Sequence, residues 1–261
     1  MTTNTIAIIG GSGFHQLAHF LTNKSHKIDT VYGQPSAPIL EGELFGQSIF
    51  FLPRHGVEHS IQPHLINYRA NIAALAELGV THVIGLAAVG GIAVNCSPGS
   101  LVIPEQILDY TYNREMTFFD QTGDVAHAEF SDPYDQGMRN AFIQIADTKS
   151  IELVKSGCYA ATQGPRFETR AEIKRLQNDG ATIVGMTAMP ESALAREKSM
   201  AYMTIASSVN YAAGIKEEVI CHDEIHQAYQ IASEKLFAAL PDFLEEVTKL
   251  SVPTTPELIR P

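Results

Sequence analysis

The sequence contains little cysteine, and its cysteines are unsuited to a cross-link or a metal site. The three cysteines among 261 residues are Cys96, Cys158 and Cys221, which are widely spaced and form no CxxC pair. An odd, scattered set of this kind is typical of small buried residues in a reducing compartment. We therefore expect no disulfide framework, no zinc site and no other metal.

Positive charge is also scarce. The chain has 18 Lys and Arg against 29 Asp and Glu, a formal net charge of −11. Nucleic acids and anionic membranes are bound by broad basic surfaces, so we expect neither as a partner. Any phosphate that the protein binds must then meet a local positive site.

A long apolar run is missing as well. The first residues, MTTNTIAIIGG, have no basic flank, and their apolar run is too short for a signal peptide or a membrane span. We expect a cytoplasmic protein.

The rest of the composition predicts one α/β domain. With 45% hydrophobic residues the chain can bury one large core, and neither an internal repeat nor a low-complexity linker divides it. We expect the domain to cover residues 1–251. Residues 252–261 contain three prolines and are expected to form a loose tail.

Residues 185–211 place two polar side chains at predicted strand ends. An apolar run is followed by Thr187, and a second run, over residues 202–207, leads to Asn210. Between them a helix is expected to begin at Pro190 and Glu191, because proline is tolerated at the first helical position and a carboxylate there meets the positive end of the helix dipole. Open α/β sheets bind ligands at the carboxyl ends of their strands, which makes Thr187 and Asn210 candidates.

Two further predicted strands end in groups that can approach an anion. Residues 5–9 precede a glycine-rich turn that contains Ser12; it is either an anion-binding loop or a plain tight turn, since Gln16 replaces the third glycine of a dinucleotide fingerprint. Residues 41–51 alternate in a way that predicts a hairpin, which leads into a strand at residues 49–52 just before Arg54 and His55. The arginine supplies a fork of donors suited to phosphate, or it pairs with a carboxylate at the surface.

Other segments add candidates with equally open interpretations. Residues 83–88 form an apolar run typical of a strand buried on both faces, and a glycine pair follows it. A helix is expected from Pro63 to Gly79, with Leu65 on its apolar face. Thr169 and Glu172 match a capping box; Glu168, just before it, either faces a pocket or interacts with the helix dipole. Residues 109–135 form a long irregular segment of the kind that carries function or an interface.

Taken together, these motifs resemble a known family. They are GGSGF at 10–14, RHG at 54–56, PHLINYRANI at 63–72, VGG at 89–91, QGPRFET at 163–169, GMTAMPE at 185–191 and the region of Asn210. The chain is similar over nearly its whole length to the trimeric purine nucleoside and methylthioadenosine phosphorylases. This resemblance implies a central mixed β-sheet flanked by helices, a homotrimer, and phosphorolysis of a purine nucleoside to free base and ribose 1-phosphate. Inorganic phosphate is then a co-substrate, and no cofactor is needed.

The resemblance also implies roles for individual residues. Phosphate would be held by side chains of Ser12, Arg54, His55 and Thr187 and by the backbone of Ala87 and Ala88. Relatives such as methylthioadenosine phosphorylase have a threonine in place of Ala87, so this chain lacks one side-chain contact. The nucleoside would meet Met186, Phe167, Glu168, Asn210, Tyr211, Ala212 and His222, together with His127 lent by a neighbouring subunit. Asn210 and His55 are the candidate catalytic residues.

Two of these positions predict a 6-oxopurine. Adenine-specific relatives have aspartates where this chain has Asn210 and Ala212, and Glu168 matches a glutamate used against N1–H. An amide can donate to a 6-oxo oxygen and accept from a protonated N7, whereas an ionised carboxylate only accepts.

The 5′ side of the sugar leaves alternatives. His222 matches a histidine of relatives that take a 5′-hydroxyl, while Ile225 and Val219 could form an apolar lining. Overall the sequence is most similar to bacterial methylthioinosine phosphorylases, which implies cleavage of S-methyl-5′-thioinosine to hypoxanthine and 5-methylthioribose 1-phosphate. The alternatives are an inosine or guanosine phosphorylase, a methylthioadenosine phosphorylase, or a non-catalytic nucleotide-binding protein.

Overall fold

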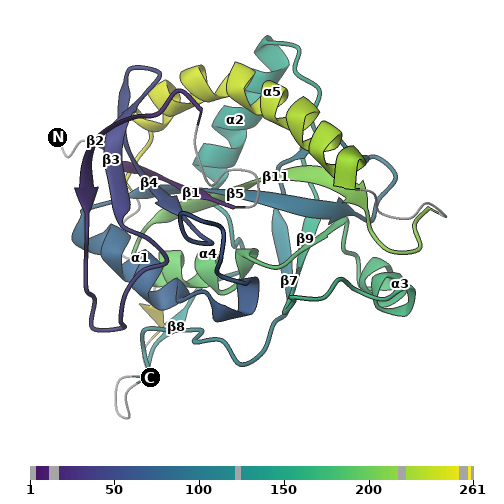
Figure 1. The fold of residues 1–261 in the computed structure, drawn as a ribbon, viewed down its shortest axis with the longest axis horizontal. Helices are drawn as coiled ribbons and strands as arrows, with labels where there is room; N and C mark the ends of the chain where they lie inside the picture. The colour runs from purple at the N-terminus through teal and green to yellow at the C-terminus, as the bar shows by residue number, and fades with distance from the viewer. Residues whose placement is uncertain (1–3, 12–17, 121–124, 217–221, 253–257, 260–261) are drawn as a thin grey trace.

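A mixed β-sheet runs through the middle of the molecule (Figure 1). The computed structural model describes the chain apart from residues 1–3, 12–17, 121–124, 217–221, 253–257 and 260–261. Within that part, ten strands form one sheet in the order β2-β3-β4-β1-β5-β10-β9-β7, and β11 pairs with both β5 and β6. The strands are β1 (Ile6–Gly10), β2 (Leu21–His26), β3 (Ile39–Leu44), β4 (Gln47–Pro53), β5 (His82–Gly91), β6 (Leu101–Val102), β7 (Gln106–Tyr110), β9 (Cys158–Thr162), β10 (Ile183–Gly185) and β11 (Ala201–Tyr211).

Helices cover both faces of the sheet. In Figure 1, α2 (Gln136–Thr148) and α5 (His222–Val247) lie on one face, α1 (Tyr68–Glu77) and α4 (Ala188–Glu197) on the other, and α3 (Arg170–Asn178) lies at one end beside β9. The sheet therefore has an apolar core on each face, and strand β1 contributes to both cores because successive side chains of a strand point to opposite faces. Ile6 and Ile8 pack with α2 and α5, whereas Ala7 and Ile9 pack with α1 and α4.

The central strands β1, β4, β5 and β11 run in the same direction, so their carboxyl ends lie at the same edge of the sheet. Strand β1 is parallel to β4 and β5, and β5 is parallel to β11. Strand β10 runs antiparallel to β5, so the sheet is mixed, as expected. The predicted hairpin is confirmed as β3 and β4, and the predicted capping box of α3 is present with both of its hydrogen bonds.

The helix expected from Pro63 is wrong at its start. Pro63–Leu65 form a single 3₁₀ turn, and the backbone is extended at Ile66. Helix α1 begins only at Tyr68, where Asn67 caps it by accepting a hydrogen bond from the Ala70 amide. Leu65 is therefore 65% exposed and does not share the apolar face of α1.

The tail is not loose throughout. Strand β12 (Leu258–Ile259) pairs antiparallel with β8 (His127–Ala128), which ties the described end of the tail to the long segment after β7.

None of the helices in the described ranges is long and apolar enough to cross a membrane.

Candidate active site

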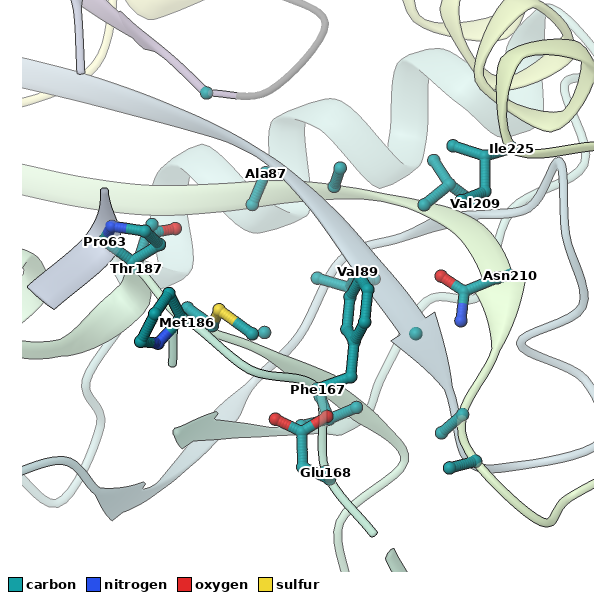
Figure 2. Close-up of a pocket in the computed structure, with 18 of the residues that line it drawn as sticks. Pro63, Ala87, Val89, Phe167, Glu168, Met186, Thr187, Val209, Asn210 and Ile225 are labelled. Atoms are coloured by element: carbon teal, nitrogen blue, oxygen red, sulfur yellow. The ribbon is translucent and has the colours of Figure 1, made fainter. Parts of the chain in front are cut away.

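A pocket of about 290 Å³ opens where β5, β10 and β11 meet the segments after β4 and before α3. Figure 2 shows Thr187 and Pro63 at one end and Asn210 at the other, with Met186 and Phe167 between them. Ten of the residues predicted from the sequence line this pocket: Arg54, His55, Ala87, Ala88, Phe167, Glu168, Met186, Thr187, Asn210 and Ala212.

Thr187 has a hydroxyl that its own helix does not use. It is the N-cap of α4, yet its side chain makes no capping hydrogen bond, and the residue is 8% exposed. Its backbone N–H lies 3.5 Å from the Tyr159 hydroxyl, which helps to hold the turn after β10. The Thr187 hydroxyl also interacts with the Tyr159 hydroxyl. Because a hydroxyl has one donor and two acceptor sites, it can still bind a ligand at the pocket surface.

Arg54 is a buried residue with a buried partner, which excludes the interpretation of a surface ion pair. Its Nε and Nη2 donate to the two carboxylate oxygens of Glu191, both at 2.7 Å, and its Nη1 donates to the Leu86 carbonyl at 2.8 Å. Arg54 is 1% exposed and Glu191 0%. Burial by itself lowers the pKa of Arg54, but the Glu191 carboxylate outweighs burial and the pKa lies above its ordinary value.

This pairing changes what Arg54 can offer a ligand. A guanidinium has five N–H donors, and three of them are used in these bonds. The fork predicted for phosphate therefore holds Glu191, and the remaining N–H groups of Nη1 and Nη2 are left for the pocket. Gly11 allows this arrangement, because a Cβ there would lie 2.6 Å from both Nη1 of Arg54 and the Leu86 carbonyl oxygen.

His55 is held in a neutral form beside this cation. Its Nδ1 lies 2.8 Å from the Ile61 carbonyl, which can only accept, so Nδ1 carries the proton. Burial, the Arg54 charge and His59 together lower the pKa of His55 to about 4. Near pH 7 its Nε2 is then a hydrogen-bond acceptor, suited to a protonated oxygen of phosphate.

A β-bulge directs Asn210 into the other end of the pocket. The register of β11 against β5 shifts between Ser208 and Asn210, so that Ser208 pairs with Val89 and Asn210 with Gly90. Bulges of this kind re-aim side chains. The Asn210 Nδ2 donates to the Tyr211 carbonyl at 2.7 Å, which fixes the orientation of the amide. Its oxygen and second N–H remain for a ligand.

Glu168 is oriented by a neighbouring hydroxyl. Thr162, at the end of β9, donates to its Oε1 at 2.6 Å. Glu168 and Phe167 both line the pocket, and in Figure 2 the Phe167 ring stands next to the Glu168 carboxylate. An aromatic face beside a carboxylate and an amide is suited to a flat heterocycle with polar edges.

Known proteins share this sequence and fold. Residues 5–245 match the Phosphorylase superfamily. The chain therefore belongs to the phosphorylase superfamily. A probable S-methyl-5′-thioinosine phosphorylase of Xylella fastidiosa is 45% identical over 95% of this chain and 100% of its own. A probable 6-oxopurine nucleoside phosphorylase of Thermococcus kodakarensis is 42% identical over 94% and 93%.

A solved structure of the superfamily agrees with the fold. The methylthioadenosine phosphorylase of Schistosoma mansoni in complex with adenine superposes with a TM-score of 0.89 and 31% identity, over 95% of this chain and 93% of that one. Superfamily membership gives the reaction class, but these relatives differ in the nucleoside that they are named for. The choice of nucleoside therefore depends on the pocket of this chain.

Some predicted residues lie elsewhere. Tyr211 does not line the pocket; its ring lies 4.3 Å from the Lys216 ammonium, because it points to the opposite side of the strand from Asn210. His127 is exposed on β8 and does not line the pocket within one chain. His222 begins α5, and its side chain lies outside the described part of the chain, as does Ser12.

Sequence reasoning missed residues whose role depends on distant partners. Val209 lines the pocket through the irregular register of β11, and Pro63 lines it from the 3₁₀ turn. Glu191 was expected only to meet the helix dipole and is instead the partner of Arg54. The sequence did show an acidic residue, Glu191, among apolar residues at the start of a helix. That pattern does not indicate which residue pairs with it.

The pH behaviour of His55 follows from its environment. We expect its imidazole to titrate near pH 4 in the folded protein, against about 6.5 unfolded, because burial and Arg54 oppose its charge. Since the unfolded state binds the proton first, His55 makes the protein lose stability as pH falls from about 6.5 to 4. Two-dimensional NMR of the imidazole checks the midpoint, with His55→Asn to assign the signal. A midpoint at or above 6.5 contradicts the prediction.

The Arg54–Glu191 pair makes a prediction about stability. Glu191→Gln leaves a buried guanidinium without its counter-charge, and breaking a buried pair costs about 3–5 kcal/mol of unfolding free energy. Urea denaturation at fixed protein concentration measures the loss. Glu245→Gln is the matched control, because Glu245 pairs with Lys249 at the surface and should change stability by at most about 0.5 kcal/mol. Equal losses of unfolding free energy in the two variants would show that the buried pair stabilises the protein no more than the surface pair does.

Proposed function

We propose that the protein cleaves S-methyl-5′-thioinosine with phosphate, releasing hypoxanthine and 5-methylthioribose 1-phosphate. The observation that carries this proposal is the set of polar groups in the pocket, because Asn210 and Glu168 both line it together with Phe167. Ala212 also lines the pocket, so neither position that would accept from a 6-amino group carries a carboxylate.

Phosphate would bind at the end of the pocket that holds Thr187. The donors there are the Thr187 hydroxyl and the free N–H groups of Arg54, and His55 would accept from a protonated phosphate oxygen. Ala87 and Ala88 also line the pocket, and their backbone would contact phosphate. Ser12 is a further donor in the proposal.

The reaction requires placement and charge stabilisation rather than a protein nucleophile. As the glycosidic bond stretches, positive charge develops on the sugar and negative charge on the purine. Phosphate held at the Thr187 end attacks the anomeric carbon, forming the new C–O bond as the C–N bond breaks. Met186 lies between the two ends and would pack under the sugar.

Asn210 would stabilise the departing base. Its amide oxygen can accept from N7 when N7 takes a proton, and its free N–H can donate to the 6-oxo oxygen. Glu168 would accept from N1–H. A pocket built to satisfy one set of buried donors and acceptors discriminates against the other by up to about 10⁴–10⁵.

The apolar side of the pocket supports a 5′-methylthio group. Val209 and Ile225 both line the pocket and lie at the same end in Figure 2. A thioether loses little on burial there, whereas a 5′-hydroxyl needs a partner. The alternative is an inosine or guanosine phosphorylase, in which His222 would contact the 5′-hydroxyl. A methylthioadenosine phosphorylase is disfavoured by Asn210.

The proposal extends to the assembly and its setting. We infer a homotrimer in which the exposed His127 of β8 reaches the sugar site of a neighbouring subunit. We also infer a cytoplasmic enzyme of purine salvage without nucleic-acid or membrane partners. A non-catalytic nucleotide-binding protein is disfavoured by the number of ligand-suited groups that share one pocket.

A substrate panel tests the function directly. We expect phosphate-dependent cleavage, with the highest kcat/KM for methylthioinosine over inosine, guanosine and methylthioadenosine. Liquid chromatography of the released bases, with and without phosphate, measures it. Preference for inosine or guanosine would establish the alternative of an inosine or guanosine phosphorylase. Comparable use of methylthioadenosine would refute the assignment of a 6-oxopurine base. No cleavage of any nucleoside would refute the proposal that the protein is an enzyme.

Asn210→Asp tests the base end separately. The carboxylate cannot donate to the 6-oxo oxygen, and loss of one such donor lowers kcat by about 10²–10³-fold. We therefore expect methylthioinosine turnover to fall while the relative rate with methylthioadenosine rises. Asn140→Asp, on the exposed side of α2, makes the same chemical change away from the pocket and should leave the ratio unaltered. An unchanged ratio in Asn210→Asp would contradict the role of the amide.

A further inference from the structure

Arg114 donates hydrogen bonds to several groups beside the pocket, although it does not itself line the pocket. It lies in the segment between β7 and β8 and is half-buried. Its Nη1 donates to the carbonyls of Met186 and Met189, at 2.8 and 2.6 Å, and to the Tyr68 hydroxyl at 3.1 Å. Its Nη2 donates to the Gln163 carbonyl at 2.9 Å, and its Nε to the Gln163 side-chain oxygen at 3.0 Å.

These acceptors belong to two segments of chain that both line the pocket. The base segment, residues 162–168, carries Phe167 and Glu168. The phosphate segment, residues 184–189, carries Met186 and Thr187. One planar guanidinium thus bonds to the backbone of both.

The two segments also touch directly, where Gly164 packs against the Met186 side chain. Gly164 has a φ of +65°, and a Cβ there would lie 2.5 Å from the Met186 sulfur. The backbone of the base segment therefore lies directly against a side chain of the phosphate segment. Arg114 bonds to both segments next to this contact.

The chemistry of Arg114 is that of a structural clamp. Among the described residues no ion pair involves it, and most of its partners are neutral carbonyl oxygens. Hydrogen bonds from a charged donor are stronger than neutral ones, and a guanidinium presents its donors in one fixed plane. The Tyr68 ring, 5.2 Å from the guanidinium carbon, further limits its orientation.

Arg69 makes a useful comparison, because it binds the same long segment but not the pocket. It donates to Asp120 at 2.5 Å and pairs with Glu115 at 2.9 Å, and its guanidinium carbon lies 5.0 Å from the Tyr32 ring. None of these partners lines the pocket. Replacing either arginine therefore loosens the long segment and can lower overall stability. Only the replacement of Arg114 also removes contacts with the base segment and the phosphate segment.

We propose that Arg114 is a positioning residue that sets the separation of the base segment and the phosphate segment. This inference rests on the proposed function, because that separation fixes the distance between the anomeric carbon and the attacking phosphate oxygen. Arg114 contacts no substrate and acts only through Met186, Thr187, Phe167 and Glu168.

Kinetics of matched variants test the proposal. A misplacement of about 1 Å can cost about 10²-fold in rate, so we expect Arg114→Ala to lower kcat by about that factor and to raise KM for both phosphate and nucleoside. Arg114→Lys retains the charge without the planar fork and should fall between Arg114→Ala and the wild type. Arg69→Ala should keep kcat and both KM values within about twofold of the wild type, since its partners do not line the pocket. Equal kinetics for Arg114→Ala and Arg69→Ala would overturn the proposal.

Hydrogen exchange tests the same claim without using the reaction. In Arg114→Ala we expect peptides covering residues 162–168 and 184–189 to exchange at least about tenfold faster than in the wild type, with no such change in Arg69→Ala. Faster exchange in only one segment, or in neither, would contradict the clamp. If Arg114→Ala does not fold, the same measurement on Arg114→Lys decides. An inactive wild type with the expected exchange pattern would refute the proposed function and leave the clamp intact.

Discussion

The buried ion pair between Arg54 and Glu191 is the constraint on which the candidate site depends. It joins the end of β4 to the first turn of α4, and the Tyr202 hydroxyl of β11 donates to the same carboxylate at 2.7 Å. Charges buried at this depth are tolerated only when their hydrogen bonds are complete, and here both carboxylate oxygens and most guanidinium donors are engaged. Because Glu191 must meet Arg54, the start of α4 and with it Thr187 are fixed relative to β4.

This pair also determines the electrostatics of the phosphate end. Glu191 balances the charge of Arg54, so the pocket does not attract an anion by a free cation alone. In the proposed function, selective phosphate binding therefore depends on directed groups: the Thr187 hydroxyl, the unused guanidinium N–H groups and the neutral ring of His55. Preorganised donors of this kind stabilise developing charge without reorganisation during the reaction. Under this proposal, a chain of net charge −11 would hold an oxyanion through directed groups at a local site.

Several elements could be predicted because their signals are local. The apolar run of β5, the β3–β4 hairpin and the capping box of α3 each depend on residues close in sequence, and the structure has all three. The prediction that a helix starts at Pro63 was wrong, and the reason is also local. Asn67 is a better N-cap than Gln62, which precedes Pro63 and makes no capping hydrogen bond. The Asn67 side chain accepts a hydrogen bond from the Ala70 amide, and α1 begins at Tyr68.

By itself the sequence determined which residues stand at strand ends, since the apolar runs and the polar groups after them are local features. It placed Thr187, Asn210 and Arg54 in the site on that basis. Only the tertiary structure decided their partners and directions. Glu191 is 137 residues from Arg54, Asn210 is aimed by a register shift against β5, and Arg114 bonds to segments 48 to 75 residues away. Such contacts arise when distant strands pack together, and no local pattern encodes which distant groups will meet.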